Sequence, residues 1–237
     1  MLVSGVRSWS ERLGLLALLS LVVGPAYGLD ITMCGQLVPA GETGVLQADL
    51  SDCSVNVVVT VEDGGSVSLN GHSITSSVSE VNGILCYGGC VVKGPGTISV
   101  DYAITHNGQR RRQSLTVEDV NLENNGGAAI ISTRGFVLAT NVTVTGNALE
   151  NSPNTPVILA LGGIVGTNLT VTNNGGWGIV TYRRLTLVDS VLTGNNGGGT
   201  GVDILALHRP RFINSTCGKS AGRGTDYAPW GICTGDP

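Results

Sequence analysis

The sequence predicts an all-β fold in which one chain winds into a parallel β-helix, a solenoid of short strands. Three observations predict it: a strand-and-turn repeat between residues 115 and 214, a high glycine content, and few charged or aromatic residues. Four copies of the repeat align on Asn-rich turns whose last Asn is placed at Asn125, Asn147, Asn174 and Asn196, in steps of 22, 27 and 22 residues. Three strands and three turns at this period make one coil of a solenoid.

The composition agrees with a stack of strands and turns. Of the 237 residues 36 are Gly, 4% are aromatic and 13% are charged. Gly adopts positive φ at tight corners, whereas a soluble helical protein carries more Glu, Lys, Leu and Ala. The length bounds the chain to one domain or at most two.

Residues 1–28 have the pattern of a secretory signal peptide. Arg7 and Arg12 flank the start of an apolar run over residues 13–23, and residues 26–28 form a small-x-small cleavage site. An N-terminal membrane anchor is the alternative, but the run is shorter than the roughly 20 apolar residues that a span needs. We therefore expect a secreted, extracellular or cell-surface protein without a membrane association after cleavage.

Cleavage would leave the mature chain slightly more acidic. It removes two of the 13 basic and one of the 17 acidic residues, which leaves a net charge of −5. This balance argues against nucleic acid as a partner of the whole molecule.

All six cysteines follow the predicted signal peptide. An even number in an exported chain indicates disulfides. Because the cysteines cluster towards the two ends, we favour sequential pairing among the fifteen possibilities: Cys34–Cys53, Cys86–Cys90 and Cys217–Cys233. Zinc at Cys86 and Cys90 is the alternative; three residues separate them and no His lies nearby, so we predict no metal site.

The order of patterns divides the mature chain into three parts. Residues 29–65 are predicted to cap the first coil, because an open end exposes core and unpaired strand edges. Residues 66–214 form the β-helix itself. Residues 215–237 leave the repeat, and their cysteines and aromatic residues favour a disulfide-tied tail over the last coil, with a frayed terminus as the alternative.

Five short motifs extend the pattern towards the N-terminus: Cys34-Gly35, Asp49–Cys53, Asn70–Ile74, Asn82–Ile84 and Gly94–Ile98. In these motifs the chain resembles exported bacterial proteins of the right-handed parallel β-helix, pectate-lyase-like class, over about residues 34–214. The resemblance implies a right-handed coil. It implies little about activity, because most such proteins carry no established one.

Two columns of equivalent residues follow from the repeat. An inward column stacks at the strand spacing of ~4.8 Å and comprises Ile130, Ile158, Ile179 and Ile204. A polar corner column comprises Asp119, Asn141, Asn168 and Ser190, where Asn and Asp tolerate left-handed backbone. Two members lie in N-glycosylation motifs, but we interpret the column as a structural ladder and expect only Asn214 to be an exposed acceptor.

The resemblance directs a search for catalytic groups to the outer face of the strands after the Asn turns. Simple alternation predicts the outward residues to be Ala129, Ile131, Val157, Leu159, Gly178, Val180, Asp203 and Leu205. This strip is apolar, and we expect it to be covered by another part of the chain or to contact another chain. Asp203 is its single carboxylate, so the pair that hydrolysis requires is missing.

Basic residues concentrate in one turn column. Eight of the eleven in the mature chain fall there, namely Arg110, Arg111, Arg112, Arg134, Arg183, Arg184, Arg209 and Arg211, and His208 joins them. Four coils at ~4.8 Å per step make a basic ridge of roughly 20 Å. Arg forks suit carboxylates and sulfates, so we expect the ridge to bind an acidic polysaccharide. The alternative is that the arginines pair with Glu118, Glu80 or Asp101.

These patterns favour an exported, non-catalytic surface or matrix protein that binds a polysaccharide or another cell-surface component. The alternative is a polysaccharide lyase, glycoside hydrolase or epimerase acting on uronate polymers. In that case Asp203 would be the base, and His208, Arg183 and Arg209 would neutralise charge. No cofactor is predicted, except Ca²⁺ if the enzymatic alternative holds.

Overall fold

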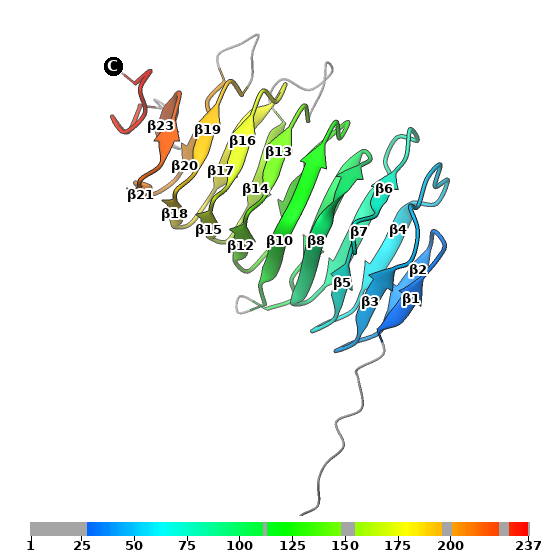
Figure 1. Cartoon of the computed structure of the whole chain (residues 1–237). Coiled ribbons are helices and arrows are strands. Elements are labelled where there is room, and N and C mark those ends of the chain that lie inside the picture. Colours follow the sequence, from blue (N-terminus) through cyan, green and yellow to red (C-terminus); the bar gives the residue numbers. More distant parts are fainter. Residues whose placement is uncertain (1–27, 111–112, 148–154, 196–200, 223–227, 237) are drawn as a thin grey trace, which may run out of the picture.

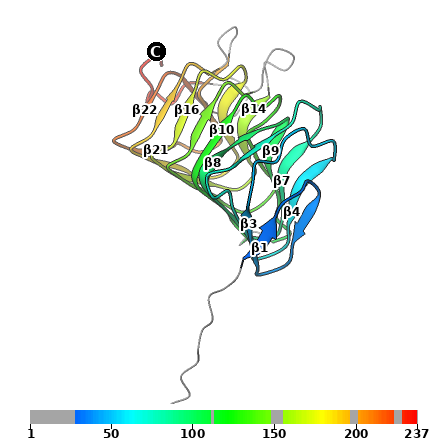
Figure 2. The same ribbon diagram turned by 45° about the vertical axis from the view of Figure 1, so that its right-hand side comes forward.

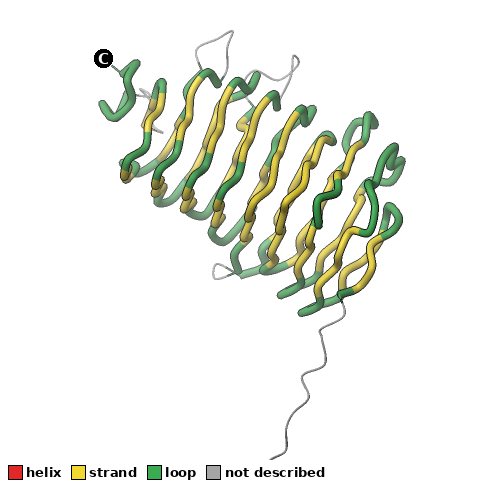
Figure 3. The backbone as a smooth tube through the Cα atoms, viewed as in Figure 1, coloured by secondary structure: helices red, strands yellow, loops and turns green. Residues whose placement is uncertain are grey.

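The computed structural model describes residues 28–110, 113–147, 155–195, 201–222 and 228–236, and it is a parallel β-helix. Strands stack from β1 (Leu29–Ile31) at one end to β23 (Ser220–Gly222) near the other (Figures 1 and 2). Figure 3 shows only strands and loops within the described ranges. No helix of this part of the chain has the length and apolar character to cross a membrane.

The first face of each coil lies in the larger of two parallel sheets. Its strands follow one another in space in the order β1, β3 (Thr43–Leu46), β5 (Ser66–Ser68), β8 (Cys90–Ser99), β10 (Leu115–Glu123), β12 (Val137–Thr140), β15 (Ile164–Thr167), β18 (Leu185–Val188) and β21 (Arg211–Ile213). Neighbours in this order are one coil apart in sequence, as the repeat predicts.

The second face is a separate sheet. Its order is β2 (Gln36–Val38), β4 (Val57–Val61), β7 (Asn82–Tyr87), β9 (Tyr102–Asn107), β11 (Ile130–Ser132), β14 (Pro156–Ala160), β17 (Trp177–Thr181), β20 (Ile204–Ala206) and β23. Because β1 to β4 already pair in these two sheets, residues 29–61 form the first coils themselves.

The third face continues the larger sheet around a corner. It contains β6 (Ser73–Thr75), β13 (Thr143–Thr145), β16 (Thr170–Thr172), β19 (Val191–Thr193) and β22 (Thr216–Cys217). Strands β8 and β10 are long enough to serve both faces, and the register shifts between Glu118 and Val120 where β10 bends.

The core is a set of stacked apolar columns inside the coil. On the second face Ile84, Ile104, Ile130, Ile158, Ile179 and Ile204 pair in register and are buried. The expected Ile column is therefore confirmed and begins two coils earlier. Burial of each such side chain contributes about 1.5–3 kcal/mol, so stability accumulates coil by coil.

The predicted cysteine pairing is confirmed. Cys34–Cys53 lies at the N-terminal end, Cys86–Cys90 links β7 to β8, and Cys217–Cys233 ties β22 to the C-terminal segment. Three disulfides fit an oxidising compartment. The predicted signal peptide lies outside the described residues, apart from Gly28.

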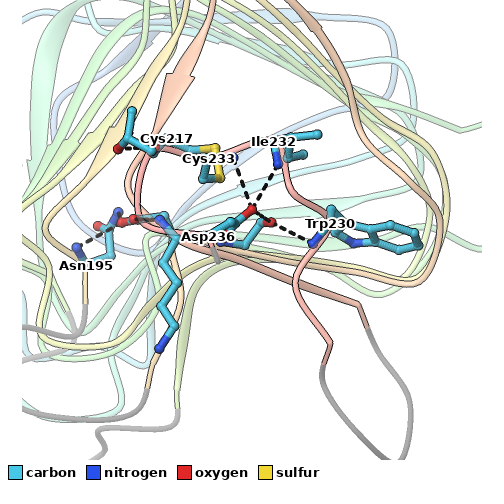
Figure 4. The surroundings of a disulfide bond; sticks show 10 residues. Asn195, Cys217, Trp230, Ile232, Cys233 and Asp236 are labelled. Carbon is cyan, nitrogen blue, oxygen red and sulfur yellow. Dashed lines mark hydrogen bonds between the residues drawn. A yellow bond between two sulfur atoms is a disulfide. The ribbon is translucent and has the colours of Figure 1, made fainter.

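The C-terminal segment folds onto the last coil (Figure 4). The Thr234 N–H donates to the Cys217 carbonyl at 3.0 Å. The Asp236 carboxylate accepts from the backbone N–H groups of Ser220 at 2.7 Å and of Ile232 and Cys233 at 3.0 Å each. Burial opposes ionisation here, but these hydrogen bonds outweigh it and lower the pKa of Asp236.

An exposed polar ladder lies at the corner between the first and third faces. Asp119, Asn141 and Asn168 have φ of 57°, 54° and 50°. The Asn141 Nδ2 donates to Asp119 Oδ1 at 2.8 Å, and the Asn168 Nδ2 donates to Asn141 Oδ1 at 3.0 Å. These hydrogen bonds confirm the ladder, but Asn141 and Asn168 are exposed like Asn214, so the expectation that only Asn214 is an exposed acceptor is wrong. The fourth member of the ladder is Asp189 at φ 49°, whereas the predicted Ser190 is buried.

A buried amide ladder lies at the corner between the third and second faces, and comprises Asn125, Asn147, Asn174 and Asn195. Each Nδ2 donates to the Oδ1 of the next, at 2.5, 2.9 and 2.7 Å. The predicted fourth member, Asn196, is wrong by one residue, because the register Val171–Leu192 makes this coil 21 residues long.

The predicted outward strip is only half right. Ala129 and Val157 are fully buried and belong to the core together with their neighbours Ile130 and Ile158. Two successive residues point inward here because the first of each pair still belongs to the corner with the amide ladder and the second begins the strand. Simple alternation between inward and outward residues therefore fails at this point. Further along, Leu159 is half-buried in the strip.

The outward residues of the strip nearest the C-terminal end are covered by neighbouring side chains and are not exposed. Val180 is 5% and Leu205 3% exposed. They form a second apolar cluster with Val202 and Ala221, and Trp177 and Tyr182 pack against it.

Candidate functional site

A column of short turns joins the second face to the first in successive coils. We call it the arginine turn, and it comprises residues 133–136, 161–163, 182–184 and 207–210. The strands before these turns pair in register, which brings to equivalent positions Arg134, Gly162, Arg183 and His208. Successive members are ~4.8 Å apart along the axis. The column follows the lower edge of the stack in Figure 1.

The strands after these turns define a second, parallel column. The pairing of Val137, Ile164 and Leu185, and of Thr186 with Arg211, aligns the residues Phe136, Gly163, Arg184 and Arg209. The first column is interrupted at Gly162, between Arg134 and Arg183, whereas the second carries Phe136 before Gly163 and the cations Arg184 and Arg209 after it.

The arginine turn borders a groove of about 1010 Å³. Its lining residues are Gln109, Thr133, Arg134, Gly135, Phe136, Leu161, Gly162, Gly163, Arg183, Arg184, His208 and Arg209. None of the described residues that line this groove is a carboxylate, and the groove spans four coils from Arg134 to Arg209. We call it the arginine groove.

The groove arginines have no acidic partner in the described part of the chain. The acids proposed as their partners are engaged elsewhere: Glu118 Oε2 lies 3.4 Å from Lys93 Nζ, and Asp101 Oδ2 accepts the Glu80 N–H at 2.6 Å. The Arg134 guanidinium donates to the Gln109 carbonyl at 3.2 Å, a neutral acceptor. Among the described residues, no arginine therefore forms an ion pair with Glu118, Glu80 or Asp101.

Two exposed apolar side chains lie between the cations. Phe136 is 48% and Leu161 42% exposed, and both line the groove. Phe136 was not predicted from the sequence, because the ridge was identified by its charges alone. The sequence did contain a sign of this residue. Phe136 is one of only two Phe residues in the chain, and it follows Gly135 in a turn, where a polar residue is usual.

A buried polar pair supports the turn from inside the coil. His106 is fully buried, with its Nε2–H donating to the Gly88 carbonyl at 2.6 Å and its Nδ1 lying 2.8 Å from Ser132 Oγ. Ser132 Oγ is also 2.9 Å from the carbonyl oxygen of Arg134. Burial lowers the pKa of His106 although the Gly88 contact opposes this. The neutral imidazole therefore holds the Gly88 carbonyl, and the single Ser132 hydroxyl proton is shared between Nδ1 and the Arg134 carbonyl oxygen.

The other predicted ridge arginines divide into three groups. Arg110 is exposed and follows Gln109, a lining residue. Arg111 and Arg112 lie outside the described residues. Arg211 is exposed on the first face, in register with Thr186, and does not line the groove.

The four catalytic candidates do not come together. Arg183, His208 and Arg209 line the groove. Asp203 does not, because it is 4% exposed and ends the amide ladder: its Oδ1 accepts from Asn195 Nδ2, and its Oδ2 accepts the Lys219 N–H at 2.8 Å. The expectation that Asp203 faces outward is wrong, since it occupies one of the inward corner positions.

The described residues contain no cluster of three or more His, Cys, Asp or Glu arranged to hold a metal ion. No protein-family model, curated protein or solved structure matches the chain.

Proposed function

We propose that this protein is an exported β-helix protein of the pectate-lyase-like class that binds an acidic polysaccharide along the arginine groove. The observation that carries the proposal is a continuous groove lined by four arginines, none of which has an acidic partner among the described residues. Unpaired cations gathered on one surface of a net acidic chain require an explanation, and a polyanionic ligand supplies it.

The chemistry of the groove suits carboxylate or sulfate groups on a sugar polymer. The guanidinium fork binds such groups with two parallel hydrogen bonds. Exposed Phe136 offers an apolar plane for the C–H face of a sugar ring. The groove runs across coils, so it accommodates an extended chain better than a compact ligand.

Export supports the same proposal. The three disulfides fit an oxidising compartment, and the N-terminal residues have the pattern of a signal peptide. A protein outside the cell meets acidic polysaccharides of walls, capsules and matrices as its most abundant polyanions.

Binding of soluble uronate polymers, measured as a function of salt, tests the proposal. We expect affinity to fall as salt rises, because exposed charges are screened. Arg184→Ala should weaken binding about tenfold. The matched control is Arg211→Ala, an exposed arginine outside the groove, which should change affinity less than about twofold. Absence of binding at low salt, or equal losses in both variants, would contradict the proposal.

Incubating the protein with the same uronate polymers also tests the enzymatic alternative. A lyase would release unsaturated products that absorb in the ultraviolet, and a hydrolase would release reducing ends. Because the groove offers His208, Arg183 and Arg209 without a carboxylate, we expect neither product.

A further inference from the structure

The middle coil of the arginine groove has a different chemistry from the coils on either side. Arg134 lies on one side, and Arg183 and Arg184 lie on the other. The coil between them contributes Leu161, Gly162 and Gly163, none of which carries a charge. The register places Arg134 and Arg183 two coils apart, a separation of ~10 Å along the axis.

The gap between the cations is built into the backbone. A Cβ at Gly162 would collide with the carbonyl oxygen of Gly135. A Cβ at Gly163 would lie 2.6 Å from the Phe136 ring and 2.8 Å from the Arg184 carbonyl oxygen. Neither position accepts a side chain, so the floor of the groove stays low and uncharged at this coil.

Apolar side chains border this floor. Phe136 reaches over Gly163, and Leu161 precedes Gly162 in the same turn. A carboxylate placed here would lose hydration without gaining a cation, which is unfavourable. An uncharged sugar ring would instead place its C–H face against Phe136 and Leu161.

We infer that the groove selects a glycan in which an uncharged sugar lies between two anionic ones. This inference rests on the proposed function. A 1,4- or 1,3-linked pyranose advances a chain by roughly one coil spacing, so a ring over Gly163 brings the anionic groups of its two neighbours to Arg134 and to Arg183–Arg184. The middle coil supplies the ring contact, and the flanking coils supply the charge contacts.

The test compares two probes of equal length, an eight-sugar hyaluronan fragment with one carboxylate per disaccharide and an eight-sugar polygalacturonate fragment with one per sugar. Charge counting alone predicts tighter binding of polygalacturonate. We expect hyaluronan to bind at least as tightly. Phe136→Ala should weaken hyaluronan binding about tenfold without changing its salt dependence.

A gain of charge gives a second, independent readout. Leu161→Arg places a cation in the middle coil at an exposed position and should raise polygalacturonate affinity about tenfold, with a smaller effect on hyaluronan. The matched control is Leu138→Arg, a similarly exposed position on the first face outside the groove, where no change is expected.

The outcomes separate this inference from the proposed function. If neither probe binds, the proposed function is wrong. If polygalacturonate binds at least tenfold more tightly than hyaluronan to the unaltered protein, the groove still binds polyanions, and only the selection of an uncharged sugar between two anionic ones is overturned. Equal effects of Leu161→Arg and Leu138→Arg would also overturn it.

Discussion

The two ends of the second face carry polar columns of opposite character. At one end the amide ladder is buried, and each Asn bonds the next. At the other end the arginine turn is exposed, and its guanidinium groups have no acidic partner in the described chain. Both columns repeat with the coil. Repetition alone therefore does not show what a column does, because the two columns differ in their hydrogen-bond partners and not in their periodicity.

The sharpest way to break this comparison is to remove one rung of the amide ladder. Asn147 accepts the N–H and Nδ2 of Asn125 and donates to the Leu122 carbonyl at 2.9 Å. Asn147→Leu leaves these buried groups unpaired, and we expect a loss of about 3 kcal/mol or more in the free energy of unfolding, measured with denaturant.

The exposed ladder supplies the control. Asn141→Gly keeps the positive φ of that corner and removes an amide that water can replace, so the loss should stay below about 1 kcal/mol. If both variants lose the same stability, the distinction between buried and exposed ladders is wrong.

The end of the ladder gives the next largest effect. Asp203 accepts at both oxygens, from the N–H and Nδ2 of Asn195 and from the Lys219 N–H. Asp203→Asn turns an NH₂ group towards one of these donors, and we expect a loss of about 1–3 kcal/mol, seen as a lower thermal midpoint. Asp119→Asn, on the exposed ladder, should stay within about 0.5 kcal/mol of the parent.

Substitutions in the arginine turn should change ligand affinity and leave stability unchanged, unlike those in the amide ladder. Arg183→Ala/Arg184→Ala removes two exposed side chains, so stability should change by less than about 0.5 kcal/mol. Affinity for an acidic polysaccharide should fall at least tenfold, measured by calorimetry at low salt. Lost stability together with unchanged affinity would assign these arginines to the fold.

The smallest effect concerns the buried pair beneath the arginine turn. The pKa of His106 is lowered by burial, so below pH of about 6.5 the unfolded chain takes up a proton before the folded one does. Stability contributed by neutral His106 is complete above that pH and is lost as the pH falls towards the folded pKa, at no more than about 1.4 kcal/mol per pH unit.

Comparison with His106→Gln isolates this contribution, because Gln keeps an N–H donor for the Gly88 carbonyl without titrating. We expect the free energy of unfolding of the parent to fall more than that of the variant between pH 6.5 and 5. The range starts at about 6.5 because this is the ordinary pKa of histidine in an unfolded chain. Parallel pH profiles would show that His106 does not contribute.

The repeat in the sequence predicted the coiled fold correctly, but it did not predict which residues of the last Asn-rich turn align with those of the coils before it. Adjacent Asn195 and Asn196 are chemically identical, so an alignment anchored on Asn chose the wrong one. The stacking of Val144, Val171 and Leu192 decides between them, because a core column tolerates no slip. Anchoring the repeat on inward apolar residues would have identified Asn195 and, with it, Asp189.

The candidate site was predicted in part. Clustering of arginines in one turn column is visible in the sequence, because the repeat fixes which residues are equivalent. The inward position of Asp203 could not be seen in the sequence, since two successive residues face the core at the corner with the amide ladder. The partners of Glu118 and Asp101 depend on side-chain contacts between coils, which no periodic pattern specifies.

The amide ladder also has a direction, which limits how the solenoid can be lengthened. Each Nδ2 donates one hydrogen bond to the next side chain towards the C-terminal end, and Asp203 closes the series because a carboxylate receives hydrogen bonds and passes none on. Extra coils with their own Asn can be inserted upstream as interchangeable modules, whereas the coil beyond Asp203 meets it through the Lys219 N–H and no Asn can extend the ladder there unless Asp203 is replaced. The carboxylate therefore ends the ladder, although one further coil, from β21 to β23, stacks beyond it.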